Sequence, residues 1–106
     1  MNSRTISLSA PLKTHDGDKM EITVNEPRAK SFFDHGEPFK TRVVTDGHKD
    51  RIEIDYNNSI LRKFLQDMTG IDDLVLGGLR ARDFYALRNA ATDLIFGVAG
   101  ENPTPT

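Results

Sequence analysis

The 106-residue sequence contains no cysteine and no long apolar run, and these absences exclude several classes of protein. Without cysteine there is no disulfide framework, no thiol nucleophile and no cysteine-based zinc site. No apolar stretch approaches the roughly 20 residues of a membrane-spanning helix, and the first residues do not have the pattern of a secretory signal. The sequence therefore predicts a cytosolic protein with no membrane partner.

Excess positive charge is also absent, since the formal net charge is −2. Nucleic acids and anionic lipid surfaces are normally bound by basic patches, so we expect no nucleic-acid partner. A chain of this length has room for one domain with a modest hydrophobic core.

Catalytic motifs are missing as well. The sequence has no Gly-x-Ser-x-Gly elbow and no glycine-rich phosphate loop that ends in Lys-Ser or Lys-Thr. Asp72 and Asp73 are adjacent carboxylates, but acidic residues at the start of a helix are more simply interpreted as caps. We expect no enzymatic activity and no cofactor.

A metal site is not predicted either. Residues 16–18 match the beginning of a calcium loop, but the position of the closing Glu in the twelve-residue frame is Pro27. His15, His35 and His48 are far apart and fall in predicted turns or at helix ends, so we expect them in solvent.

The N-terminal half is predicted to contain strands and one short helix. Apolar and polar residues alternate in 6–12 and again in 20–24, with a turn at 15–19 between them. Pro27 fits the first position of a helix that ends at Gly36. Residues 36–40 are expected to be a connector, and 43–56 predict either a second hairpin or one strand preceded by a mobile loop.

The C-terminal half predicts two helices joined by a short bridging helix. The first begins at about Ser59, after cap residues that include Asn57, and ends at Gly70. Asp72 and Asp73 begin the bridging helix. Apolar residues at helical spacing form one face on each of the two long helices: Ile60, Leu61, Phe64, Leu65 and Met68 on the first, and Phe84, Leu87, Ala91, Leu94, Ile95 and Val98 on the second.

The order of these elements resembles a known family. An opening strand with Leu-x-x-Pro (residues 8–11), a Glu-Pro step (26–27), and a helix followed by Thr-Gly-Ile (69–71), an acidic pair and a final apolar helix resemble the small tail assembly chaperones of Mu-like and P2-like contractile-tailed phages and prophages. The resemblance covers roughly residues 5–35 and 58–97. Arg80 departs from it, because many relatives have Ser or Thr as the cap at that position.

The resemblance implies an α+β fold, with antiparallel hairpins followed by the helical unit. We expect a single domain over residues 1–99 and a disordered tail over 100–106. The resemblance also implies a chaperone that binds the tape-measure protein, keeps it soluble and promotes assembly of tail-tube subunits around it. Such a protein works in the cytoplasm of the host bacterium and is absent from the mature virion.

Two other functions remain open. A basic strip on the C-terminal helices would suit a small DNA-binding regulator, although nearby aspartates dilute it; the strip would comprise Arg62, Lys63, Arg80, Arg82 and Arg88. A structural subunit of the virion is the other alternative.

The six phenylalanines are many for so short a chain. Either all of them belong to the core, or some line a groove for a partner helix or a second copy. We expect Phe84 and Leu87 to pack inward against the first long helix. Ile95 and Phe96 lie near the chain end, where fewer residues can cover them, and are therefore the predicted protein-binding residues, for the client or for a symmetric homodimer.

Overall fold

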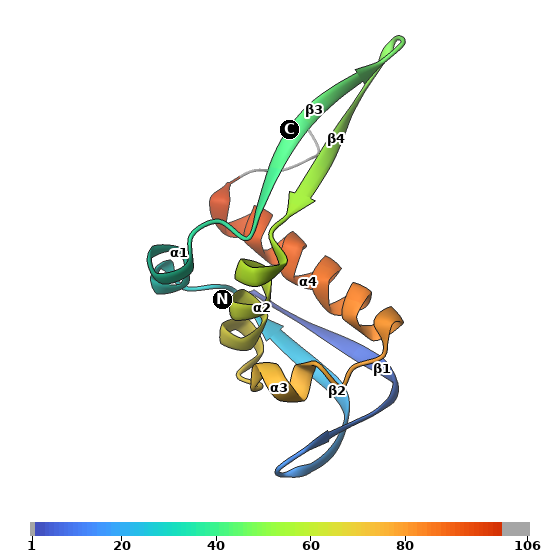
Figure 1. The fold of residues 1–106 in the computed structure, drawn as a ribbon, viewed down its shortest axis with the longest axis vertical. Helices are drawn as coiled ribbons and strands as arrows, with labels where there is room; N and C mark the ends of the chain where they lie inside the picture. The colour runs from blue at the N-terminus through green and yellow to red at the C-terminus, as the bar shows by residue number, and fades with distance from the viewer. Residues whose placement is uncertain (1, 101–106) are drawn as a thin grey trace.

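A computed structural model describes residues 2–100, which form two antiparallel hairpins and four helices (Figure 1). The α+β class and the order of hairpins and helices agree with the sequence prediction. The residues expected to form a disordered tail lie outside the described part, except Gly100. The elements are β1 (Ser3–Thr14), β2 (Gly17–Asn25), α1 (Ala29–His35), β3 (Phe39–Asp46), β4 (Lys49–Tyr56), α2 (Asn58–Thr69), α3 (Asp73–Leu76) and α4 (Ala81–Ala99).

The β1–β2 hairpin has an interruption in its ladder. Ser7 is opposite Glu21, but the next pair is Leu12 with Lys19, so several residues of β1 bulge out against one residue of β2. Pro11 lies within the bulge and has no N–H to donate to a ladder. The bulge bends the hairpin, and its tip turns away from the helices (Figure 1).

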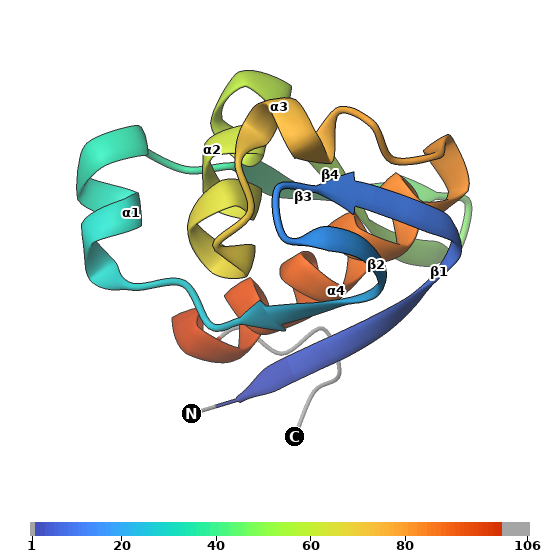
Figure 2. The same cartoon turned by 90° about the horizontal axis from the view of Figure 1, so that it is seen from below.

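The body of the protein consists of β1, β2 and the four helices. One face of the β1–β2 hairpin packs on α2 and α4, and α1 lies against α2. The short helix α3 contacts both α2 and β1 (Figure 2). The alternation predicted from the sequence produces this packing, because every second residue faces the helices. The most deeply buried large side chains of the body include Ile22, Val24, Leu61, Phe64, Met68 and Leu87.

The helix ends follow the predicted capping chemistry in most cases. The Asn57 side chain accepts a hydrogen bond from the Ile60 N–H, and Gly70 ends α2 in the left-handed conformation with φ 71°. Asp72 caps α3 by accepting from the Leu74 N–H. Arg80, the departure noted above, precedes α4 without a side-chain cap.

Two predicted boundaries are wrong. Helix α1 begins at Ala29 with Arg28 as its N-cap, so Pro27 precedes this helix instead of opening it. The expected connector ends early, because β3 begins at Phe39; the pairing of Phe39 with Tyr56 extends the ladder to the base of the second hairpin.

The β3–β4 hairpin, Phe39–Tyr56, is called the arm below. It projects from the body and gives the molecule its long axis, with extents of 50 × 29 × 25 Å (Figure 1). Gly47 has φ 66° in the two-residue turn at its tip, a conformation that favours glycine. Among the described residues, no helix is both long and apolar enough to cross a lipid bilayer.

Candidate protein-binding groove

The two faces of the arm differ in chemistry. Strand alternation places the residues of every second cross-strand pair on the same face. One face is mainly charged and contains the pairs Lys40–Asp55, Arg42–Glu53, Val44–Arg51 and Asp46–Lys49. The other is mainly apolar and contains the pairs Phe39–Tyr56, Thr41–Ile54 and Val43–Ile52, followed by Thr45–Asp50 at the tip.

An aromatic cluster fixes the base of the arm to α4. The ring of Phe39 is edge-on to that of Tyr56, with centroids 5.6 Å apart, and lies 5.3 Å from the ring of Phe96. The Tyr56 hydroxyl also forms a 2.9 Å hydrogen bond with Thr92 of α4. These contacts anchor the apolar face of the arm at its base. Toward its tip, the arm diverges from the body (Figure 1).

Arg88 of α4 adds to the contact between the base of the arm and α4. Its guanidinium lies 4.2 Å from the ring centre of Tyr56 and 4.8 Å from that of Tyr85. Stacking on two aromatic rings is favourable for a cation. The Arg88 Nε is buried and has no hydrogen-bond partner among the described residues. Arg88 therefore acts here as a packing side chain between the arm and α4.

Two hollows have Phe96 in their lining. The base groove, of about 540 Å³, is lined by Phe32, Phe39, Ile95, Phe96 and Val98 together with polar residues at its rim. The wedge, of about 310 Å³, opens between the arm and α4 and is lined by Ile52, Ile54, Tyr56, Asn89, Thr92, Asp93 and Phe96. Phe96 contributes to both.

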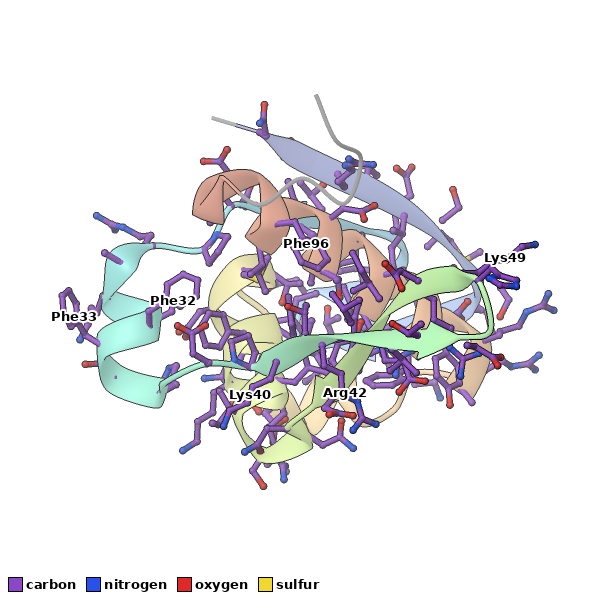
Figure 3. The ribbon with its side chains drawn as sticks, turned by 90° about the horizontal axis from the view of Figure 1, so that it is seen from above. Phe32, Phe33, Lys40, Arg42, Lys49 and Phe96 are labelled. Carbon is purple, nitrogen blue, oxygen red and sulfur yellow. The ribbon has the colours of Figure 1, made fainter. Side chains whose placement is uncertain are left out.

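Figure 3 shows the side chains around these hollows. Phe96 lies between α4 and the arm, whereas Lys40 and Arg42 are on the other side of β3. Phe32 points toward the body, where its ring is edge-on to Phe64 with centroids 4.9 Å apart. Phe33 points outward and is 88% exposed. The two hollows thus combine apolar side chains with polar lining residues, which are Glu37, Lys40, Thr41, Asn89, Thr92 and Asp93.

The predicted contact residues Ile95 and Phe96 have different environments. Phe96 is half-buried and borders both hollows. Ile95 is only 4% exposed and belongs to the core, so the expectation that it is left uncovered is wrong. Helical spacing explains its burial, because Ile95 continues the inward stripe of Leu87 and Ala91 and reaches the groove only as part of its floor.

Phe84 packs against the core as predicted, but less completely than Leu87. Leu87 is fully buried as expected, but Phe84 is half-buried and packs at the margin of the core. It borders a separate hollow of about 230 Å³ with Leu65, Leu76 and Leu87. Its ring is edge-on to Tyr85 with centroids 5.5 Å apart. Phe84 is therefore a weaker core residue than its spacing indicated.

A polar contact that the sequence did not reveal positions α4. Asp83 is buried and accepts hydrogen bonds from the Ser9 N–H at 3.0 and 3.1 Å and from the Ser9 Oγ at 2.9 Å. The bulge in β1 frees the Ser9 N–H from the ladder, and Asp83 satisfies it. The carboxylate is also in the first turn of α4, where the helix dipole favours negative charge.

Asp67 makes a similar connection between α1 and α2. It accepts from the buried Ser31 hydroxyl at 2.8 Å and lies 3.0 Å from the His35 Nε2. His35 is half-buried against the Phe64 ring, so the expectation of a solvent histidine is wrong at this position.

The three histidines do not come together. His15 is in the β1–β2 turn and His48 in the β3–β4 turn, at opposite ends of the long axis, while His35 ends α1 (Figure 1). Within residues 2–100 no group of three or more histidine, aspartate or glutamate side chains is arranged to hold a metal ion.

Two of the arginines considered for DNA contact are engaged within the chain. Arg62 donates to both carboxylate oxygens of Asp73, and this hydrogen bond lowers the pKa of the Asp73 carboxyl below its ordinary value. Arg88 is held between Tyr56 and Tyr85. Neither side chain belongs to a free basic strip.

Comparison with known proteins adds no family assignment: no family model, no curated protein and no solved structure matches this chain.

Proposed function

We propose that the protein is a non-catalytic tail assembly chaperone of a contractile-tailed phage or prophage, which binds amphipathic helices of the tape-measure protein. In this proposal the client's apolar stripe occupies the base groove and the wedge, which share Phe96. The chaperone acts in the cytoplasm of the host bacterium, also assists the tail-tube protein, and leaves before the virion is complete.

The observation that carries the proposal is the pair of hollows, the base groove and the wedge, that share Phe96. A long helical client exposes apolar stripes that aggregate unless another surface covers them. A helix in a groove is recognised by apolar anchors at successive turns, and the two hollows, which share Phe96, offer places for such anchors. An apolar centre with a polar margin is the usual anatomy of a protein interface.

Co-expression tests the proposal directly. We expect this chain to raise the soluble fraction of the tape-measure protein of the same phage or prophage, and the two to co-purify. Val98→Glu places a charge in the base groove at a residue that is already 42% exposed. This variant should remain folded and lose co-purification, because the incoming apolar side chain would desolvate the new carboxylate.

Leu74→Glu is the matched control. Leu74 is 85% exposed on α3, in the body and away from the arm, so the same change of charge and polarity should leave client binding intact. Equal solubility of the tape-measure protein with and without this chain would refute the proposed function. Equal loss of binding in both variants would refute the assignment of the groove.

Phe96→Ala gives a second measure of the same site. The change removes the ring that packs 5.3 Å from Phe39 and should cost about 1–2 kcal/mol of stability. Client binding should fall more than this loss of stability accounts for, since aromatic anchors dominate interface energies. A parent-like affinity measured below the unfolding transition would place the binding surface elsewhere.

A further inference from the structure

Among the residues that the structure describes, no strand pairs with the outer edge of β4. β3 and β4 form a two-stranded sheet, so each has one edge with free backbone groups. The pair that flanks a two-residue turn is hydrogen-bonded, and hydrogen-bonded pairs then alternate along the ladder. Starting from Asp46–Lys49, this alternation directs the N–H and C=O groups of Asp50, Ile52 and Ile54 away from β3. In the described part of the chain these groups make no backbone hydrogen bond outside the hairpin.

We propose that two copies of this chain associate through β4, in an antiparallel pairing with Ile52 on the twofold axis. The arms then form one continuous sheet, with two strands from each copy. The proposal does not depend on the proposed function, because it rests on the charges and free edge of the arm alone.

The order of charges along β4 selects this register. With Ile52 on the axis, Arg51 is opposite Glu53 of the second copy, and the reciprocal contact forms by symmetry. Lys49 is likewise opposite Asp55 of the second copy. Opposite charges on directly facing residues attract, and like charges repel. All charged contacts on this face are therefore favourable.

The neighbouring registers each contain a repulsion. An axis at Glu53 or at Arg51 would place that residue opposite its own copy. An axis at Ile54 would place Glu53 opposite Asp55, and an axis at Asp50 would place Lys49 opposite Arg51. The register with Ile52 at the centre is thus the one among these that has complementary charges throughout.

Backbone geometry agrees with the same register. Ile52 would exchange hydrogen bonds with Ile52 of the second copy, and Asp50 with Ile54, and all three residues have outward N–H and C=O groups. Ile52 is 51% exposed in the single chain, so the pairing covers apolar surface. The other edge, β3, is less suitable, because the register centred on Val43 provides Lys40–Asp46 contacts but places Arg42 opposite Val44.

Charge-reversal variants test the register. Arg51→Glu places glutamates opposite each other, and Glu53→Arg does the same with arginines. We expect each variant alone to dimerise about tenfold or more weakly than the parent chain. An equimolar mixture should form a heterodimer, because every contact between the two variants is again of opposite charge. Sedimentation at a series of concentrations measures all three samples.

The matched control is Lys40→Glu. It makes the same change of charge on the same face but on β3, so the dimer should be retained. A parent chain that is monomeric at every concentration overturns the proposal. So does a mixture of Arg51→Glu and Glu53→Arg that remains monomeric. Formation of the heterodimer would show that the weak association of each variant alone is not caused by general damage to the arm.

A cysteine crosslink provides a geometric test, since the natural chain has no cysteine. In Ile52→Cys the two Cα atoms would face each other at about 5.5 Å, a separation that a disulfide spans. This variant should form a covalent dimer on mild oxidation. Ile54→Cys should not, because its copies would be separated by four residues along the strand, roughly 13 Å. Equal crosslinking of both variants would exclude the proposed register.

Discussion

The two hairpins have the same alternation of apolar and polar residues but very different surroundings. In the body, Ile22 and Val24 of β2 are 2% and 0% exposed, because α2 and α4 cover that face. In the arm, Val43 is 69% exposed although it is equally apolar. The aromatic cluster covers only the base of the arm. Alternation therefore establishes that a strand has an apolar face, but not what covers that face.

This difference has consequences for stability and for function. An isolated two-stranded hairpin is at best marginally stable in water. The arm is supported by its anchored base and by cross-strand ion pairs such as Arg42–Glu53 at 3.0 Å. The body, in contrast, has a continuous hydrophobic core. We infer that the body maintains the fold while the arm and its junction with α4 are available for binding.

The largest difference between body and arm is expected when one apolar side chain in each region is shortened to alanine. Phe64 is completely buried and contacts Phe32, so Phe64→Ala should cost about 3–5 kcal/mol and unfold much of so small a protein. Val43→Ala in the arm should change the free energy of unfolding by less than about 0.5 kcal/mol. Thermal and urea unfolding of the two variants measure the contrast. Similar losses would mean that the arm contributes to the global core.

A polar contact of the body provides the next test. Asp83→Ala removes the hydrogen bonds that the carboxylate of buried Asp83 accepts from the Ser9 N–H and hydroxyl, and should cost about 1.5–3 kcal/mol. Asp93→Ala removes an exposed carboxylate that lies 3.7 Å from Arg4 and should be nearly neutral. If the two variants have equal midpoints in urea, the Ser9–Asp83 contact does not stabilise the body.

Most elements of the body were predictable because their signals are local. Asn57, Gly70 and Asp72 mark helix ends through their own side chain or backbone, and the first hairpin follows from period-two alternation. The Ser9–Asp83 contact was not predictable, because it joins residues 74 positions apart and depends on a bulge that only the paired strands reveal.

The candidate site was only partly predictable. Phe96 was predicted as a contact residue from its position near the chain end, and the structure shows that it lines two hollows. The same reasoning failed for Ile95, because position near an end does not determine the side of a helix on which a residue lies. The arm residues Ile52 and Ile54 were recognised as strand residues but not as part of the site, since the sequence left open whether a second hairpin forms.

A substitution in the turn at the tip should lower the local stability of the arm without changing the stability of the body. Gly47 has φ 66°, and among residues 2–100, apart from its chain neighbours, no atom lies within 4 Å of the place that a Cβ would take, so Gly47→Ala adds backbone strain without a clash. The strain should cost about 1 kcal/mol and act on the arm. Hydrogen exchange should become faster for arm amides, with the melting temperature of the body unchanged. Unchanged exchange in the arm would show that its stability does not depend on this turn.

The smallest expected effect concerns an exposed ion pair of the body. Arg62 lowers the pKa of Asp73 by hydrogen bonding and then by its charge. A carboxyl whose pKa is lower in the folded state than in the unfolded chain contributes stability above the unfolded pKa, and this contribution is lost as the pH falls through the folded pKa. Arg62→Gln should therefore lower the melting temperature by at most a few degrees at pH 7. The difference from the parent should disappear in acid, below the ordinary carboxyl range, and should shrink with added salt.

Lys63→Gln removes a neighbouring positive charge that has no ion pair among the described residues, and it should show neither trend. A difference for Arg62→Gln that persists at low pH would mean that the side chain stabilises α2 through packing and not through its charge.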